Sequence, residues 1–291
     1  MRASGLALGE RMPELPEVET VRLGLEPVLA GRRLTRVEAR RPDLRFPLPV
    51  DFVQRLTGAR VLSLSRRGKY LLAALDRDAT LLIHLGMTGR FEIEGAAAPG
   101  AFALAAPADP KHAHILFETD EAARITFYDP RRFGFLDIVD GGDDRLAGLG
   151  PEPLGPEFNA AFLGEAFAGR RQSPKTLLLD QRIVAGLGNI YVCEALYRAH
   201  VSPLRPAGGL KRRELERLVS AIVEVLREAI VQGGSTLRDF AAADGALGYF
   251  QHSFQVYDRE GDPCSSPVCR GVIVRTVQAG RSTFHCPLCQ R

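Results

Sequence analysis

The hydrophobic pattern of the chain changes from a helical to an extended period soon after its start. After Pro16, apolar side chains at Val18, Val21 and Leu25 recur at helical spacing, and proline is favoured in the first turn of a helix. The next hundred residues hold short apolar segments with strand composition, at 61–65, 70–75, 80–85, 91–94, 112–118, 125–128 and 135–139. Many short strands at close spacing predict an antiparallel sandwich or barrel that follows one short helix.

A helical period returns after a linker rich in glycine and proline. One apolar stripe runs from Phe158 to Phe167, and a longer one from Leu215 to Ile230 ends at a pair of glycines. Two more helices are expected near 174–183 and 190–198. The chain is therefore predicted to be an α+β protein, with a β domain at 13–145, a linker at 146–157, a helical domain at 158–258 and a separate tail at 259–291.

Two segments lack these patterns. The Ala/Pro-rich run at 95–110 is expected to be a surface loop. Residues 1–11 show no periodicity and no helix cap, so they are interpreted as the product of an upstream start codon or as a disordered leader.

Composition narrows the class of protein but does not name it. With 45% hydrophobic and 25% charged residues, the chain has the composition of an ordinary globular protein. A net charge of +3 permits a nucleic-acid partner without requiring one. No window approaches the roughly 20 apolar residues of a membrane span, and residues 1–11 lack the apolar centre of a secretory signal. We therefore expect a cytoplasmic protein.

The cysteines predict a metal site in the tail. Cys264-x4-Cys269 and Cys286-x2-Cys289 form two close pairs, and four thiolates can close a tetrahedral zinc site. The segments between the pairs read as a hairpin with a turn at Ala279-Gly280. His285 is expected not to be a ligand, because four cysteines already fill the coordination sphere, and Cys193 is expected to be a buried small hydrophobe.

Arg281 lies at the tip of the expected hairpin, where a guanidinium can reach a phosphate. An ordinary solvated turn residue is the alternative. The segment 186–191 also has two interpretations. It is either a tight turn in which Asn189 caps the next helix, or a phosphate site made of helix N-terminal amides, with Lys175 as a nearby cation.

Three loops of the β domain combine glycine with charged and bulky residues: RGKY at 67–70, HLGMTG at 84–89 and DPRRFG at 129–134. Each one alone fits a turn with solvated charge, and Met87 and Phe133 alone fit core packing. Apolar residues on glycine-flanked loops also suit insertion into a base stack, and neighbouring arginines can fill the space that a base vacates. The occurrence of all three loops favours a nucleic-acid function.

The segment MPELPEVET at 12–20 carries the most specific chemistry. Pro13 is a secondary amine only if the chain begins there, and a terminal amine beside a carboxylate is a nucleophile with its own acid–base partner. With RRGKYLL, HLGMTG, DPRRFGF, LGPEPL, LLLDQRIVAGLGNIY, QGGSTLRDF, GYFQHSFQVYDREG and the cysteine-rich tail, this segment resembles the bacterial formamidopyrimidine-DNA glycosylases from Met12 to Arg291. The Cys-x4-Cys spacing departs from the Cys-x2-Cys usual in that family.

The resemblance implies a β-sandwich with an N-terminal helix, a helix–two-turn–helix domain with a zinc hairpin, and DNA in the cleft between them. It implies a bifunctional DNA glycosylase/AP lyase of base excision repair that removes formamidopyrimidines and 8-oxoguanine and nicks the strand by β,δ-elimination. Pro13 is then the nucleophile, Glu14 the general acid–base residue, and Lys69 a catalytic-site lysine that acts through phosphate contact. For Glu17 a capping or structural role is expected.

The resemblance also implies the DNA contacts. Met87, Arg131 and Phe133 would occupy the space left by the flipped base, and His84, Lys175, Asn189 and Arg281 would hold phosphates. The stretch 236–249 resembles the loop that closes over the base. One structural Zn²⁺, a double-stranded DNA partner and a monomer complete the expectation.

Two alternatives stay open. An endonuclease VIII-like enzyme would keep the chemistry and act on oxidised pyrimidines. A binding protein without catalysis would result if residues 1–12 were retained, because an acylated Pro13 nitrogen has no lone pair. We predict that translation starts at Met12 and that this methionine is then removed.

Overall fold

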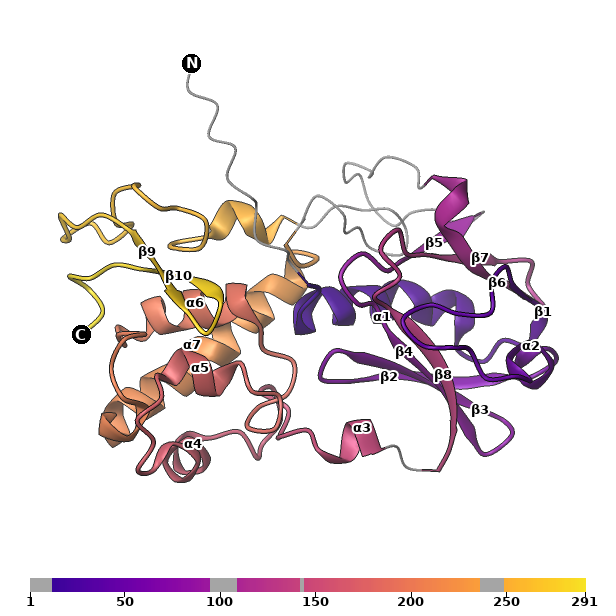
Figure 1. The fold of residues 1–291 in the computed structure, drawn as a ribbon, viewed down its shortest axis with the longest axis horizontal. Coiled ribbons are helices and arrows are strands. Elements are labelled where there is room, and N and C mark those ends of the chain that lie inside the picture. The colour runs from indigo at the N-terminus through magenta and orange to yellow at the C-terminus, as the bar shows by residue number, and fades with distance from the viewer. Residues whose placement is uncertain (1–11, 95–108, 142–143, 236–248) are drawn as a thin grey trace, which may run out of the picture.

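The computed structural model describes residues 12–94, 109–141, 144–235 and 249–291. The leader, the surface loop predicted at 95–110 and the loop at 236–249 fall wholly or mostly outside these residues. The described chain forms a β-rich part and a helical part, with helix α1 (Leu15–Leu29) between them (Figure 1). The predicted α+β class is confirmed.

Two antiparallel four-stranded sheets build the β-rich part. The first has the order β1-β6-β7-β5, with β1 at Leu34–Ala39, β6 at Ala113–Thr119, β7 at Arg124–Tyr128 and β5 at Arg90–Glu94. The second has the order β2-β3-β4-β8, with β2 at Val61–Arg67, β3 at Tyr70–Leu75, β4 at Ala79–His84 and β8 at Phe135–Asp140. The predicted sandwich is confirmed.

Strand β1, helix α2 (Phe52–Leu56) and the 3₁₀ turn η1 (Pro110–His112) were not expected from the sequence. In β1 only Leu34 and Val37 are buried, three residues apart, so the strand lacks the alternation that marks a half-buried strand. Its place in the sheet is fixed by pairing with β6 instead, from Leu34↔Thr119 to Ala39↔Ile115.

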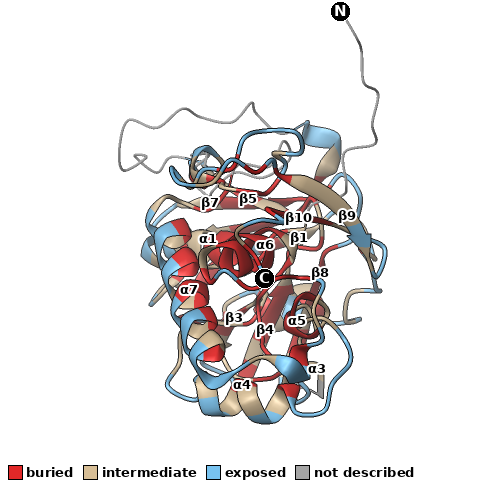
Figure 2. Ribbon diagram, turned by 90° about the vertical axis from the view of Figure 1, so that its left-hand side faces the viewer, coloured by how far each residue is buried: buried red, intermediate tan, exposed pale blue. Residues whose placement is uncertain are grey.

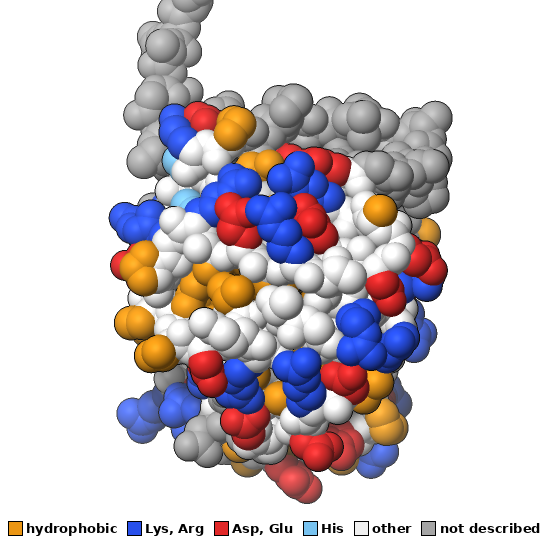
Figure 3. All heavy atoms as spheres, turned by 90° about the vertical axis from the view of Figure 1, so that its right-hand side faces the viewer, with side chains coloured by type: hydrophobic (Ala, Val, Ile, Leu, Met, Phe, Trp, Pro, Cys, Tyr) orange, Lys and Arg blue, Asp and Glu red, His pale blue; other side chains and the backbone are white. Residues whose placement is uncertain are grey.

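The outer end of the β-rich part carries charges of both signs (Figure 3). Arginines in and just after β1 pair with acids along and across the sheet: Arg36 with Glu38 and Glu118, and Arg40 with Glu38. The basic and acidic side chains on this face are interspersed, so the face is not a continuous basic surface of the kind that nucleic acid selects.

The helical part consists of α3 (Asp144–Ala147), α4 (Ala160–Phe167), α5 (Pro174–Leu178), α6 (Asn189–Arg198), η2 (Ala207–Gly209), α7 (Arg212–Val231) and η3 (Phe250–Ser253). Helix α7 is amphipathic, with its buried side toward the interior and its exposed side outward (Figure 2). Helix α6 is buried from Ile190 to Tyr197 and therefore lies at the centre of this part. None of the helices within the described ranges is both long and apolar enough to span a membrane.

Helix α5 ends at Leu178, whereas the sequence predicted a helix to residue 183. The prediction was wrong because side chains stabilise two turns at this point. Asp180 accepts a hydrogen bond from the Arg182 amide at 3.0 Å. The Gln181 side chain accepts from the Gly186 amide at 2.8 Å and donates to the Leu187 carbonyl at 2.9 Å. These bonds form the two-turn connection to α6.

Helix α1 joins the two parts. Its buried face includes Leu15, Val18, Val21 and Leu25, and the helix contacts both β2 and α7. The Leu15 amide donates to the Gly186 carbonyl at 3.0 Å, so the start of α1 is attached directly to the two-turn segment. At the other end of the chain, β9 (Val274–Gln278) and β10 (Arg281–His285) form the predicted hairpin around Ala279-Gly280.

Candidate active site between the two domains

A cavity of about 450 Å³ lies where the start of α1, the β-domain loops, helix α6 and the zinc hairpin meet. Its walls come from six segments of the chain. They are Met12 and Glu14, Lys69, Met87, the run Gly188–Ile190, Tyr257, and the hairpin residues Arg275 and Gly280–Ser282. The cavity therefore draws together residues that the sequence analysis had singled out separately.

Glu14 occupies the centre of this arrangement. Its side chain is only 4% exposed, and its carboxylate accepts hydrogen bonds from the amides of Ile190 at 2.9 Å and Tyr191 at 3.4 Å. Burial raises the pKa of Glu14 to about 7, with a further rise from Glu17 and an opposing effect of Lys69. A carboxyl group with that pKa can both donate and accept a proton near neutral pH.

The carboxylate of Glu14 closes the N-terminus of α6, a role that the sequence analysis gave to Asn189. That interpretation was wrong: Gly188 is the N-cap residue, and Asn189 is the first residue of the helix. Glu14 accepts from the amides of Ile190 and Tyr191, so these two amides are not free for a phosphate in this structure. Gly188 is required here, since a Cβ atom would lie 2.2 Å from the Glu14 carboxyl carbon.

Pro13 is buried next to Glu14, and Met12, which precedes it, lines the cavity. Glu17, in the first turn of α1, is fully buried. It accepts hydrogen bonds from the Glu14 amide at 2.9 Å, the Tyr191 hydroxyl at 2.5 Å and the Ser235 amide at 2.8 Å. Glu17 thus has the expected capping role, and it also connects α1 to α6 and to the end of the segment after α7.

Lys69 lies at the tip of the β2–β3 hairpin. Burial lowers the pKa of its ammonium group, and nearby Arg281 lowers it further, while Glu14 and Glu17 raise it. Lys69 therefore interacts electrostatically with the Glu14 carboxylate and with the zinc hairpin across the cavity.

The hairpin that carries Lys69 is fixed by Glu152 of the linker, a residue to which the sequence analysis gave no role. The Glu152 carboxylate accepts from the Gly68 amide at 2.6 Å, from Arg66 at 2.7 Å and from Arg67 at 3.0 Å. Glu152 lies in the segment LGPEPL, and the sequence of that segment does not indicate a contact with residues more than eighty positions away.

The loops with Met87, Arg131 and Phe133 lie against each other. Thr88 donates to the buried Asp129 carboxylate at 2.5 Å and accepts from the Arg131 amide at 3.1 Å. The Arg131 guanidinium lies 4.7 Å from the centre of the Phe133 ring, and both side chains are exposed. An exposed ring on a loop that its partners hold in place is suited to contact with a base step.

His84 is at the end of β4. Burial lowers the pKa of its imidazole to about 4, with smaller contributions from Lys69 and Arg45. Its Nδ1 accepts from the Gly86 amide at 3.0 Å, which leaves the proton of the neutral ring on Nε2. His84 is thus a neutral donor near pH 7.

The predicted phosphate contacts on the helical side lie in different surroundings. Arg281 is exposed and lines the cavity. The Asn189 amide group donates to the Ser282 carbonyl at 3.0 Å. Lys175 is 0% exposed, and its ammonium donates to the Ser282 carbonyl at 2.7 Å and to the Thr283 hydroxyl at 2.6 Å. In this structure the Lys175 ammonium is therefore bound to the zinc hairpin and not exposed to solvent.

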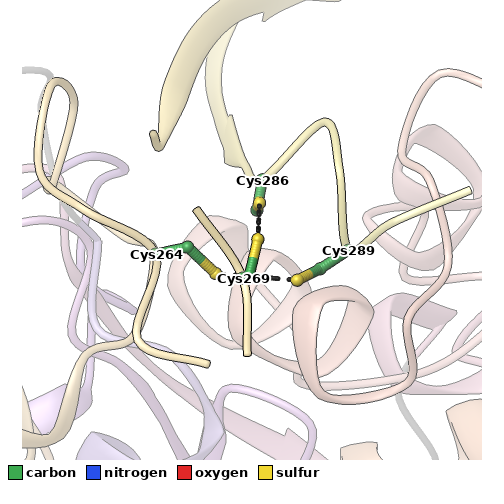
Figure 4. A group of neighbouring side chains, drawn as sticks. All are labelled: Cys264, Cys269, Cys286 and Cys289. Atoms are coloured by element: carbon green, nitrogen blue, oxygen red, sulfur yellow. Dashed lines mark hydrogen bonds between the residues drawn. The ribbon is translucent and has the colours of Figure 1, made fainter. Parts of the chain in front are cut away.

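The four tail cysteines form one cluster with their sulfur atoms turned toward a common centre (Figure 4). All four Sγ atoms lie within 4.8 Å of one another, with 3.6 Å between Cys264 and Cys289 and 3.7 Å between Cys269 and Cys286. A tetrahedron with Zn–S bonds of about 2.3 Å has sulfur atoms about 3.8 Å apart. The cysteines therefore fit zinc, and the longer Cys-x4-Cys spacing does not prevent it.

Comparison with known proteins decides the family. The chain matches the formamidopyrimidine-DNA glycosylase N-terminal domain over residues 12–136, the H2TH domain of the same enzymes over 149–241, and the zinc finger found in FPG and IleRS over 261–291. The chain belongs to the formamidopyrimidine-DNA glycosylase family. The resemblance inferred from the motifs, including the zinc hairpin, is confirmed.

Members of the formamidopyrimidine-DNA glycosylase family match the chain over their whole length. The chain is 68% identical to the enzyme of Phenylobacterium zucineum (strain HLK1) and 64% identical to that of Caulobacter vibrioides (strain NA1000 / CB15N). Each match covers 96% of this chain and 100% of the relative.

Solved structures of the family have the same fold. The MutM (Fpg) protein from Thermus thermophilus is 42% identical with a TM-score of 0.81, over 96% of this chain and 98% of that one. The Lactococcus lactis Fpg in complex with DNA containing an abasic site is 34% identical with a TM-score of 0.81, over 96% and 99%.

Proposed function

We propose that this chain is a bifunctional DNA glycosylase/AP lyase of base excision repair that removes oxidised purines from duplex DNA. One observation carries the proposal: Glu14, whose pKa burial raises to about 7, lies beside Pro13 in a cavity that also contains Lys69 and the zinc hairpin. Structures of relatives with abasic-site DNA and with Fapy-dG DNA support the choice of substrate.

In this proposal the Pro13 nitrogen attacks C1′ of the damaged nucleotide. A bond forms between nitrogen and C1′, the glycosidic bond breaks, and the base leaves with its electron pair. The nitrogen then loses its proton, the C1′–O4′ bond breaks as O4′ takes up a proton, and the nitrogen lone pair forms a cationic iminium with C1′ of the opened sugar. That cation is the electron sink for elimination of both phosphates.

The nitrogen must be free for this step, so we propose that the working protein begins at Pro13. The match to the family begins at Met12, which supports this start. Residues 1–12 would then be absent from the active form, and the catalytic domain would span 13–145, followed by the linker 146–157, the DNA-binding domain 158–258 and the zinc hairpin 259–291.

Glu14 is assigned the proton transfers. A carboxyl group with a pKa near 7 can protonate the sugar oxygen and later accept a proton during elimination. Lys69 is assigned to the phosphate and to the electrostatics of the same site. Its position opposite Glu14 supports this role.

The base must leave the stack to reach Pro13, at a cost of a few kcal/mol. Met87, Arg131 and Phe133 are assigned to the vacated space, with Arg131 facing the unpaired cytosine and Phe133 against the base step. His84, Asn189 and Arg281 are assigned to phosphates, and so is Lys175 where DNA displaces Ser282. We expect a monomer that works in the cytoplasm, where the DNA is.

Base excision by the protein that begins at Pro13 tests this function. One duplex contains 8-oxoguanine opposite cytosine, and a second contains an oxidised pyrimidine. We expect the first to be cut at least tenfold faster. Faster cutting of the second would favour the endonuclease VIII-like alternative, and binding without cutting of either would contradict the enzyme.

A further inference from the structure

The hydroxyl group of Tyr197 points at the metal cluster from a helix that is not part of the zinc hairpin. Tyr197 lies near the end of α6, is 5% exposed, and has its Oη atom 3.1 Å from the Sγ atom of Cys264. Nothing in the proposed reaction requires this contact.

The direction of the hydrogen bond follows from the chemistry of the site. A zinc-bound cysteine is a thiolate and can only accept, so the phenol must donate. Four thiolates around one Zn²⁺ leave a net charge of −2, and donors to the sulfur atoms stabilise that excess. The Gly271 amide does this for Cys269 at 3.3 Å.

Four residues separate Cys264 from Cys269, which is at the long end of the spacing between zinc-ligand pairs. The chain returns to the cluster through backbone bonds from Cys264 to Gly271 at 2.9 Å and from Cys269 to Ser266 at 3.0 Å. Tyr197 adds a contact from outside this segment, on a helix that is buried over most of its length.

We propose that the Tyr197 hydroxyl donates a hydrogen bond to the zinc-bound Cys264 thiolate and is a positioning residue for the metal site. Partners of metal ligands commonly change metal affinity by 10–100-fold when they are removed. Through this bond the C-terminal end of α6 contacts the metal ligand Cys264. At the N-terminal end of the same helix, the Ile190 amide binds Glu14.

The middle of α6 supports the same connection. The buried Glu194 carboxylate accepts from the amides of Gln255, Val256 and Tyr257 at 2.8–3.1 Å, in the segment that leads into the zinc hairpin. Helix α6 thus fixes both the approach to the metal site and one of its ligands.

Tyr197→Phe in the full chain tests the proposal, because it removes one oxygen atom and keeps the ring. Zn²⁺ affinity is measured by competition with a chromophoric chelator. We expect the dissociation constant for Zn²⁺ to rise about tenfold or more. Tyr128→Phe, on β7 in the other domain, is the matched control and should leave it unchanged. A constant within twofold of wild type in Tyr197→Phe would overturn the proposal.

Co²⁺-substituted protein gives a second readout that only folded, metal-bound molecules contribute to. Loss of a donor to one thiolate should shift the sulfur-to-cobalt charge-transfer band in Tyr197→Phe and leave it in place in Tyr128→Phe. An identical band in wild type and Tyr197→Phe would show that the hydroxyl does not donate to the ligand.

Discussion

At the scale of single residues, Glu14 combines a structural contact with a proposed acid–base role. It accepts the first amides of α6 and so attaches the start of the β domain to the helical domain. The burial that this attachment requires also raises the pKa of its carboxyl group to about 7. The structural role and the acid–base role therefore have one physical cause.

Gly188→Ala should disturb both roles. The new Cβ would lie 2.2 Å from the Glu14 carboxyl carbon, so the Glu14 side chain would have to shift away from the Ile190 and Tyr191 amides. We expect a loss of about 1–3 kcal/mol in the free energy of unfolding, measured with urea, and slower base excision. Gly209→Ala is the control, since nothing lies within 4 Å of its Cβ position. Equal effects in the two variants would contradict this account of Gly188.

Glu14→Gln should change how stability depends on pH. In the unfolded chain this carboxyl has a pKa of 4.5, and burial raises it to about 7 in the folded chain. Its contribution to stability is therefore fully present below pH 4.5 and is lost as the pH rises through 7. Relative to wild type, Glu14→Gln should gain stability between pH 4.5 and pH 8, by up to roughly 3 kcal/mol.

Chemical unfolding of the full-length chain across this pH range measures that difference. Glu121→Gln, at an exposed ion pair with Arg32, is the control for removal of a carboxylate at the surface. A flat difference for Glu14→Gln would mean that the carboxyl is not protonated in the folded protein near neutral pH.

Two candidate site residues have partners that sequence reasoning did not find. Asn189 and Lys175 have the residue types of a cap and of a phosphate contact, yet their partners are the Ser282 carbonyl and the Thr283 hydroxyl on the zinc hairpin. A sequence pattern shows which bonds a side chain can make. It does not show which of several distant partners lies within reach.

At the scale of elements, two segments set the positions of Glu14 and Lys69, the proposed catalytic groups. Helix α6 holds Glu14, and the linker holds the β2–β3 hairpin through Glu152. Arg67 adds bonds from that hairpin to the Leu149 and Gly150 carbonyls at 2.9 and 2.6 Å. Lys69 is therefore positioned by the connection between the domains.

Glu152→Gln should slow strand nicking by about tenfold with little change in DNA affinity. It removes the charge that pairs with Arg66, which is only 10% exposed, and loss of a partner to a buried charged group costs on the order of 1–3 kcal/mol. Glu38→Gln, at an exposed pair on β1, is the control. The rates are measured on a duplex with a preformed abasic site. Wild-type nicking by Glu152→Gln would show that Glu152 does not position Lys69.

The elements themselves were predictable where their own residues determine them. The strands of the sandwich follow from alternating or continuous apolar runs, and α7 follows from its long apolar stripe. Strand β1 depends on its partner β6, and α5 stops early because Gln181 binds the next turn. Neither cause lies within the segment that it affects.

At the scale of the whole molecule, the two domains meet around one cavity, and the residues at its walls come from both ends of the chain. Met12, Glu14 and Lys69 face Asn189, Tyr257 and Arg281 across it. The resemblance to the family predicted this assembly of distant segments. Residue spacing within each segment could not have done so, because it carries no information about the other segments. The attachments through Glu14, Glu17 and Glu152 became visible only in the structure.

The proposed reaction depends most on the Pro13 nitrogen. Borohydride trapping on a duplex with 8-oxoguanine opposite cytosine tests it directly, with two forms of the protein compared: one that begins at Pro13 and one that retains residues 1–12. We predict a covalent protein–DNA adduct at Pro13, located by mass spectrometry, in the first form and none in the second. No adduct with the form that begins at Pro13, or equal adducts with both forms, would contradict it.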